Sequence, residues 1–352
     1  MSDLEFGVFD WLDVAPDRDT AALYEDRLAL ARRADAGGFA RYHVAEHHGT
    51  PLGLAASPAL FLAAVARETA RIRLVPTTFV VPLYDELRLV EEIGMLDQLS
   101  HGRLEIGIGK GSSPIEAAMF GRTAESQAET YAAAVPRIMA ALETGIYAPA
   151  EGDPVPLFVR PQRVPPVWYP TSNPESIARA AAQGQHTIFG FGFLSPTLDV
   201  IRTHADGFFA ARGEHTGARF GMLRHVVVAE TDERAAELAQ EAFDAHLASF
   251  THLWRQAGVD RYPDRVDVRE LAASYRFLVG SPATVAAQVV HAVAVSGINY
   301  LAGAFAFGSL SRADSLRSLE LFDTEVIPQV RRELAAASRP AENPSRSAGA
   351  GL

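Results

Sequence analysis

The sequence predicts a single (β/α)8 barrel. Eight runs with strand character alternate with helical runs over residues 4–334, a pattern typical of a parallel sheet. Eight such units in a chain of 352 residues favour a closed barrel over an open doubly wound sheet. Because no break in composition marks a boundary, we assign residues 1–334 to one domain. The small, polar tail 335–352 is expected to be disordered.

The first half of the chain has the clearest helix boundaries. Asp19 or Thr20 is the expected N-cap of the first helix, and Gly37-Gly38 ends it. Ser57-Pro58 combines an N-cap with proline at the first helical position and starts the second helix. Strands are expected at residues 4–9, 39–44, 72–81 and 103–108, and helices at 20–36, 58–69, 85–99 and 124–143.

The second half begins with an irregular stretch. Residues 145–165 are rich in proline and are interpreted as an excursion or hairpin, and residues 252–280 as an insertion or lid because their periodicity is weak. Strands are expected at residues 167–169, 187–193, 222–229 and 298–302. Helices are expected from 174, at 196–212, from 232, at 282–295 and at 311–334.

Composition excludes several classes of function. The net charge of −11 comes without a basic block, so nucleic acid and anionic membranes are poor partners. The absence of cysteine excludes disulfides and thiolate metal sites. The acidic start of the chain does not resemble a signal peptide, and no run approaches the roughly 18 apolar residues of a membrane span. We expect a soluble cytosolic protein.

The sequence Ala45-Glu46-His47-His48 follows the second strand directly and is the first candidate site. Histidine is the side chain best suited to move protons near neutral pH. Simple capping of the strand by these polar groups is an equally good interpretation from the residues alone. A metal site is not expected, because neither H-x-H nor H-E-x-x-H spacing occurs.

Two other loops suggest an anion site. Residues 107–113 are rich in glycine and include Lys110, so backbone N–H groups and one cation could approach an anion, although turn chemistry explains the glycines equally well. In residues 170–176, Asn173 is the expected N-cap of a helix, and its hydroxyl neighbours Thr171, Ser172 and Ser176 would favour a phosphate. Loops that follow barrel strands share one face, so these segments should converge there.

Together these residues resemble the bacterial luciferase-like family of flavin-dependent monooxygenases. The resemblance runs to about residue 333 and is densest from residues 45–48 through the helix at 91–99 to residues 97–111. It implies a (β/α)8 barrel that binds reduced FMN delivered by a separate reductase. Dioxygen would form a C4a-hydroperoxide that oxygenates a small organic substrate. The family also implies a homodimer.

The resemblance assigns roles to individual residues. His47 falls on the family's catalytic histidine, and Glu46 lies beside it, where it would fix the tautomer of His47. Thr77-Thr78 matches a position where relatives hold a non-prolyl cis peptide beneath the flavin ring. Phosphate contacts fall to Lys110, which stands where relatives often have arginine, and to Ser172, Asn173 and Ser176.

The resemblance does not determine the reaction. The family also contains deazaflavin-dependent hydride-transfer oxidoreductases and flavin-binding proteins without turnover, so both remain alternatives. Lysine in place of arginine at position 110 gives up bidentate phosphate geometry. Residues 304–308 lack the acidic residue of the light-emitting members, so bioluminescence is not expected. The substrate cannot be inferred from the sequence.

Overall fold

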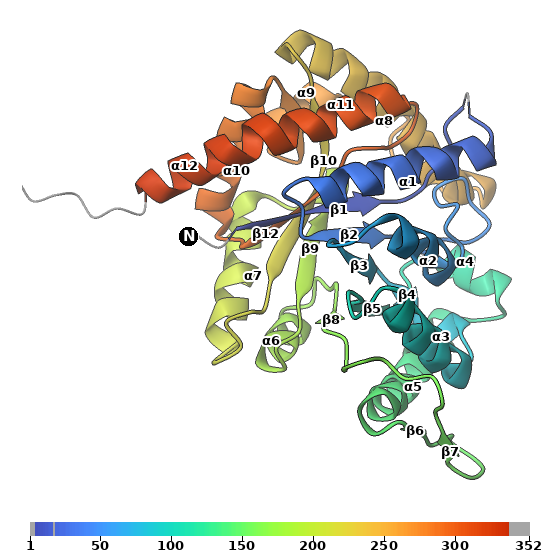
Figure 1. Ribbon diagram of the computed structural model, residues 1–352. Helices are drawn as coiled ribbons and strands as arrows, with labels where there is room; N and C mark the ends of the chain where they lie inside the picture. Colours follow the sequence, from blue (N-terminus) through green and yellow to red (C-terminus); the bar gives the residue numbers. More distant parts are fainter. Residues whose placement is uncertain (1–3, 17, 338–352) are drawn as a thin grey trace, which may run out of the picture.

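Eight parallel strands close into a barrel in the computed structural model, which describes residues 4–16 and 18–337 (Figure 1). Neighbouring strands pair in chain order, and the last pairs with the first. Isolated bridges, Leu74 with Leu104 and Trp168 with His186, complete the ring where pairing is short. The barrel strands are β1 (Glu5–Asp10), β2 (Arg41–Val44), β3 (Arg73–Pro76), β5 (Ile106–Gly109), β8 (Val167–Trp168), β9 (Thr187–Phe191), β10 (Phe220–Val228) and β12 (Tyr300–Ala304). The predicted fold class is confirmed.

Helices surround the barrel and begin at the expected caps (Figure 1). Asp19 accepts a hydrogen bond of 2.8 Å from the Ala22 N–H, and Ser57 caps the second helix. They are α1 (Thr20–Ala36), α2 (Pro58–Glu68), α3 (Glu86–Leu99), α5 (Ala124–Thr144), α6 (Pro174–Ala182), α7 (Leu198–Ala211), α8 (Asp232–Gln256), α10 (Pro282–Ser296), α11 (Arg312–Leu321) and α12 (Ile327–Ala337). The π-helical turn η3 (Phe322–Val326) joins the last two. The buried apolar faces of most of these helices form one core with the outer face of the barrel, whereas that of α8 belongs to a second apolar cluster.

Several short elements interrupt the regular alternation. The proline-rich stretch forms an antiparallel hairpin of β6 (Ile146–Tyr147) and β7 (Val155–Pro156), which agrees with the expected excursion. The predicted third strand is divided into β3 and β4 (Phe79–Val80), and the turn η1 (Val81–Leu83) follows. The turn η2 (Gly192–Leu194) follows β9. Short helices α4 (Pro114–Met119) and α9 (Val268–Ala273) lie outside the eight regular units.

The segment 252–280 is more regular than its sequence indicates. It contains the end of α8, helix α9 and a further strand, β11 (Phe277–Gly280), which was not predicted. β11 pairs with the second half of β10, whereas β9 pairs with the first half. Arg224 lies where these two partners diverge, and its guanidinium donates to the Tyr275 and Leu223 carbonyls at 2.6 and 2.8 Å. Its side chain therefore supplies hydrogen bonds where strand pairing changes from β9 to β11.

Charged and aromatic side chains fill the N-terminal half of the barrel. Glu105 accepts hydrogen bonds from Arg41 at 2.7 Å and from the Trp168 indole at 2.6 Å, and it also pairs with Arg73. Burial raises the pKa of Glu105, but Arg41, His186 and Arg73 together more than offset this, and the pKa falls to about 2. This layer of paired side chains fills the bottom of the barrel.

Within residues 4–16 and 18–337, no helix combines the length with the apolar run that crossing a bilayer requires. The tail predicted to be disordered falls almost entirely on residues 338–352, which lie outside the described residues.

Candidate active site

A cavity of about 690 Å³ opens at the C-terminal ends of the barrel strands. This is the end at which barrel enzymes place their active sites. Its wall brings together seven of the eight residues singled out from the sequence: Glu46, His47, Thr77, Thr78, Lys110, Ser172 and Asn173. Ser176 is not part of the lining. The segments expected to converge on one face therefore do so.

His47 is oriented by a carboxylate that the sequence analysis did not single out. Its Nδ1 lies 3.1 Å from Glu116 Oε1, and the same carboxylate accepts the His48 backbone N–H at 2.9 Å through Oε2. Burial raises the pKa of Glu116, but the contacts with His47 and His48 more than offset this and hold it below its usual value. Because a carboxylate at Nδ1 accepts a hydrogen bond from the ring N–H, the neutral form of His47 would have its lone pair on Nε2.

Glu46 points away from His47 and makes a separate network. It lies 2.9 Å from His48 Nε2, accepts the Tyr84 hydroxyl at 2.7 Å, and accepts the Val80 N–H at 3.1 Å. The expectation that Glu46 fixes the tautomer of His47 is therefore wrong. The physical reason is tertiary, because Glu116 of α4 occupies Nδ1 of His47 while Tyr84 and the Val80 N–H hold Glu46. A catalytic role for Glu46 stays a prediction.

The floor of the cavity is formed at the break between β3 and β4. The Thr77-Thr78 peptide bond is cis, as the resemblance implied. Thr77 Oγ1 lies 2.8 Å from His43 Nδ1, and His43 Nε2 lies 2.7 Å from the Tyr300 hydroxyl. Burial, with the charge of Arg41, lowers the pKa of His43 to about 3, so this ring is neutral. His43 therefore links the floor to the barrel interior and is not a proton donor to the cavity.

The glycines of residues 107–111 have two different explanations. A Cβ at Gly107 would lie 2.2 Å from the Pro76 carbonyl oxygen, and one at Gly109 would lie 2.4 Å from Thr78 Oγ1. Both glycines thus let β5 approach the floor closely. Gly111 has φ +85°, a conformation that favours glycine. Close packing and turn geometry explain these residues without an anion.

Lys110 and the hydroxyl residues Thr171 and Ser172 lie beside this loop and line the cavity. Lys110 is exposed to the cavity, and it forms no ion pair with any residue in the described part of the chain. The Gln127 side chain donates to the Lys110 carbonyl at 3.1 Å and thereby supports the loop. Thr171 and Ser172, which follow β8, line the same cavity. Because β8 is the neighbour of β5, these groups form one cradle, which we call the cation–hydroxyl cradle.

The start of α6 contributes less to this cradle than its sequence indicates. Asn173 is the N-cap as expected, and its Oδ1 accepts the Ser176 N–H at 2.9 Å. The Ser176 hydroxyl accepts a hydrogen bond of 3.1 Å from Arg179. The Ser176 N–H is therefore used by the cap, its hydroxyl accepts from Arg179 but keeps its O–H donor, and Pro174 has no N–H. An anion would meet Lys110 and hydroxyl groups rather than a full set of backbone donors.

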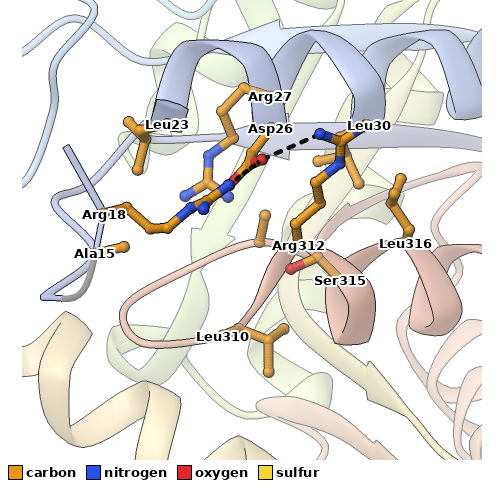
Figure 2. A pocket seen from close by; sticks show the side chains of 11 residues that line it. Ala15, Arg18, Leu23, Asp26, Arg27, Leu30, Leu310, Arg312, Ser315 and Leu316 are labelled. Carbon is orange, nitrogen blue, oxygen red and sulfur yellow. Dashed lines mark hydrogen bonds and ion pairs between the residues drawn. The ribbon is translucent and has the colours of Figure 1, made fainter. Parts of the chain in front are cut away.

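A second cavity lined by polar groups is too small to bind a ligand. Between α1 and α11, Asp26 pairs with Arg18 at 2.6 Å and with Arg312 at 3.6 Å beside a cavity of about 20 Å³ (Figure 2). That volume holds about one water molecule, so the cluster connects helices rather than binding a ligand. Among the described residues, no group of three or more His, Asp or Glu is placed to hold a metal ion.

Sequence reasoning missed Glu116 although a local signal was present. Ser113-Pro114-Ile115-Glu116 matches a capping box, and Ser113 does cap α4. In that motif the glutamate normally turns back to the N-cap N–H, whereas here it reaches His47. The further lining residues His225 and His246 belong to no motif and come from β10 and α8.

Comparisons with known proteins identify the family of the chain. The luciferase-like monooxygenase profile matches residues 4–299. An uncharacterized protein of Sinorhizobium fredii, y4wF, is 36% identical over 94% of this chain and 98% of its own length. The oxygenase component of the flavin-dependent trigonelline monooxygenase of Acinetobacter baylyi is 28% identical over 68% of this chain and 69% of its own length.

One solved structure shows the same fold. The oxygenating constituent of 3,6-diketocamphane monooxygenase from Pseudomonas putida, solved with FMN, superimposes with a TM-score of 0.76 at 21% identity. The match covers 93% of this chain and 98% of that one. The profile match extends over most of the chain and the fold agrees with it. The protein therefore belongs to the luciferase-like monooxygenase family.

Proposed function

We propose that the protein is a monooxygenase that uses reduced FMN, supplied by a separate reductase, and dioxygen to oxygenate a small organic molecule. The observation that carries this proposal is the single cavity lined by both His47 and Lys110, with the Thr77-Thr78 peptide in its floor. The relative from Acinetobacter is an oxygenase component, which supports a reductase on a separate chain. The structural neighbour bound to FMN supports the choice of flavin.

The residues present fit FMN. The cavity lies within the roughly 300–1,000 Å³ that small-ligand sites occupy, and its floor leaves room for a flat ring system. Lys110 can pair with a phosphate, and the hydroxyls of Thr171 and Ser172 can donate to phosphate oxygens. The cation–hydroxyl cradle would hold the phosphate, and Thr77 and Thr78 would lie beneath the ring.

The protein's own groups then serve proton transfer and exclusion of water. Bound reduced FMN would supply the electrons with which dioxygen is activated. His47, held by Glu116 at Nδ1, can hold or release a proton at Nε2 on the cavity side. Apolar walls, including Phe9, Phe191 and Phe250, limit the access of water to this proton.

The proposal extends to partners and location. We expect the protein to be a homodimer in the cytosol, with a reductase as the transient partner that delivers flavin. The segment 252–280 supplies Leu253, Trp254, Arg261 and Tyr262 to the cavity wall, which supports its assignment as a lid.

The test is incorporation of isotopically labelled dioxygen. Purified protein, an NADH-driven flavin reductase and FMN are incubated under labelled oxygen with a panel of ketones, aldehydes and aromatic compounds. Mass spectrometry should find one labelled oxygen atom in a product, and the reaction without the protein is the control for chemistry of free reduced flavin. No labelled product from a protein that binds FMN would overturn the proposal.

A parallel titration separates the flavins. Binding of FMN, riboflavin and a deazaflavin is followed by fluorescence, and FMN should bind tightest. A deazaflavin that binds at least about tenfold more tightly than FMN, with hydride transfer and no labelled product, would instead establish the hydride-transfer alternative.

A further inference from the structure

A second polar centre lies in the same cavity, on a different sector of the barrel from the cation–hydroxyl cradle. His225 is in β10 and is 1% exposed, yet it lines the cavity. The cradle follows β5 and β8, and β10 is the third strand around the ring from β5. A flavin held at the cradle would thus leave this sector to another molecule.

His225 is held by stacking rather than by hydrogen bonds. The Trp11 ring lies 5.0 Å away at 11° on one side, and the Phe277 ring lies 4.5 Å away at 22°. Within the part of the chain that the structure describes, neither ring nitrogen has a hydrogen-bond partner. Burial lowers the pKa of His225 well below its usual value, so the ring is neutral. A neutral imidazole offers one N–H donor and one acceptor, and both are unused here.

Buried polar atoms without partners are rare and call for an explanation. Packing does not require an imidazole at this position, because a phenyl ring would stack equally well between Trp11 and Phe277. Gly192 approaches so closely that a Cβ there would lie 2.8 Å from His225 Cε1. The chain therefore holds the imidazole firmly at the cavity wall, with both ring nitrogens buried and without a hydrogen-bond partner among the described residues.

His246 stands beside His225 and is oriented from behind. Its Nδ1 lies 2.8 Å from Asp13 Oδ2, and the ring centroid is 4.8 Å from that of His225. The Gly308 N–H donates to the same Asp13 oxygen at 2.7 Å, and Arg27 pairs with its other oxygen at 3.3 Å. Asp13 is thus fully engaged, and Nε2 is the nitrogen of His246 that is left without a hydrogen-bond partner among the described residues.

The surroundings of the two rings are apolar and aromatic. The neighbouring cavity wall consists of Phe9, Trp11, Leu52, Phe191, Phe193 and Phe250. The cations that line the cavity are Lys110, at the cradle, and Arg261, which is exposed and lies over the Trp254 and Tyr262 rings. An anionic group beside His225 would lack a counterion, whereas a neutral oxygen could accept or donate one hydrogen bond.

We propose that His225 and His246 form the substrate-recognition point, and that the substrate is an apolar, ring-sized molecule carrying a neutral carbonyl or hydroxyl oxygen. This inference rests on the proposed oxygenation, because it names the substrate class of the same cavity. The N–H of His225 donates to that oxygen, and where the oxygen is a hydroxyl its O–H donates to Nε2 of His246, whose Nδ1 is used by Asp13. The aromatic wall holds the carbon skeleton. The carbon to be oxygenated is thereby held between this centre and the flavin ring.

The test measures binding of matched probes without turnover. Acetophenone, 1-phenylethanol, ethylbenzene and benzoate are titrated into the full-length protein saturated with oxidised FMN, with ligand-observed NMR as the readout. Acetophenone and 1-phenylethanol should bind about tenfold more tightly than ethylbenzene, the factor that one net hydrogen bond provides. Benzoate should bind no better than ethylbenzene.

Two variants identify the residue responsible. His225→Phe keeps the stacking and should reduce the tenfold preference to about one, while His225→Gln, which keeps a donor and an acceptor, should restore part of it. His291→Phe is the matched control, because His291 is exposed and stacks on Tyr275 away from the cavity. Thermal melting confirms that each variant is folded.

The outcomes separate this inference from the proposed oxygenation. An unchanged preference in His225→Phe, or tightest binding of benzoate, would overturn the recognition point whether or not labelled oxygen is incorporated. If FMN does not bind, the titration is run on the protein alone. A His225-dependent preference without any oxygenation would then support the recognition point and count against the oxygenase.

Discussion

Polar groups at the two ends of the barrel interior differ in whether the chain supplies their partners. At the N-terminal end, Arg41, Glu105 and Trp168 are buried and bond to one another. At the C-terminal end, Lys110 has no ion pair and His225 no hydrogen bond among the described residues. A buried charge whose partners are all provided by the chain maintains the fold, whereas a polar group left without one is available to a ligand. The following predictions test this difference.

The largest expected effect is on stability, from removal of Glu105. Glu105→Ala leaves Arg41 and the Trp168 indole buried without their acceptor. It should lower the free energy of unfolding by about 3–5 kcal/mol, the usual cost of breaking a buried pair. Denaturation by guanidinium chloride measures this loss.

The matched control is an exposed pair. Glu68 lies 2.9 Å from Arg32, and both side chains are more than 40% exposed. Glu68→Ala should cost less than about 1 kcal/mol because solvent screens the pair. Equal losses in the two variants would show that the N-terminal end of the barrel does not depend on its matched charges.

Acid should destabilise the protein through histidines that are buried as neutral rings. Burial lowers the pKa of His43 to about 3 and that of His186 to about 4, whereas the unfolded chain titrates near 6.5. Below pH 6.5 the unfolded chain therefore binds more protons, and stability falls as the pH drops. Each histidine should cost about 2 kcal/mol between pH 7 and 5.

Unfolding free energies measured at half-unit steps of pH test whether stability falls as the pH drops. The range from pH 7 to 5 lies above the pH at which Glu105 takes up a proton in the folded protein, because its pKa there is about 2. The variant His43→Asn should reduce the slope by about 1.4 kcal/mol per pH unit. A slope that is unchanged in this variant would mean that His43 does not contribute.

At the C-terminal end, loss of His47 should act on turnover and not on folding. His47→Ala should slow oxygenation by about 10²-fold or more, the typical contribution of a general acid or base. Flavin affinity should stay within a few-fold of the parent protein. Glu116→Gln should cause a smaller loss, because the amide oxygen can still accept a hydrogen bond from the Nδ1–H of His47.

The readout is the rate of substrate oxygenation, and the exposed His215 provides a control. His215→Ala should leave that rate unchanged, because His215 lies outside the cavity lining. Normal turnover by His47→Ala would remove His47 from the mechanism.

The smallest expected effect concerns the cation–hydroxyl cradle. Lys110→Ala should weaken FMN binding by about tenfold, the scale of one charge-assisted hydrogen bond, and should change riboflavin binding much less. Lys110→Arg should restore FMN affinity. Fluorescence titration with both flavins measures the difference, and equal losses for FMN and riboflavin would place Lys110 away from the phosphate.

Local sequence patterns predicted most of the fold. The eight barrel strands and the helices between them were confirmed near their expected limits, because hydrophobic periodicity and caps such as Asp19 and Ser57 are local signals. Strand β11 was missed because its pairing with the second half of β10 depends on where β9 ends. No local pattern carries that information.

The sequence by itself therefore determined the strand order and which loops meet at the mouth, since these follow from the alternation of strands and helices. Only the tertiary structure decided which side chains face each other there. It paired His47 with Glu116 instead of the adjacent Glu46, turned Ser176 into its own helix, and placed His225 between two rings without a polar partner. Such contacts join segments far apart in the chain, and their geometry is set by packing and not by local preference.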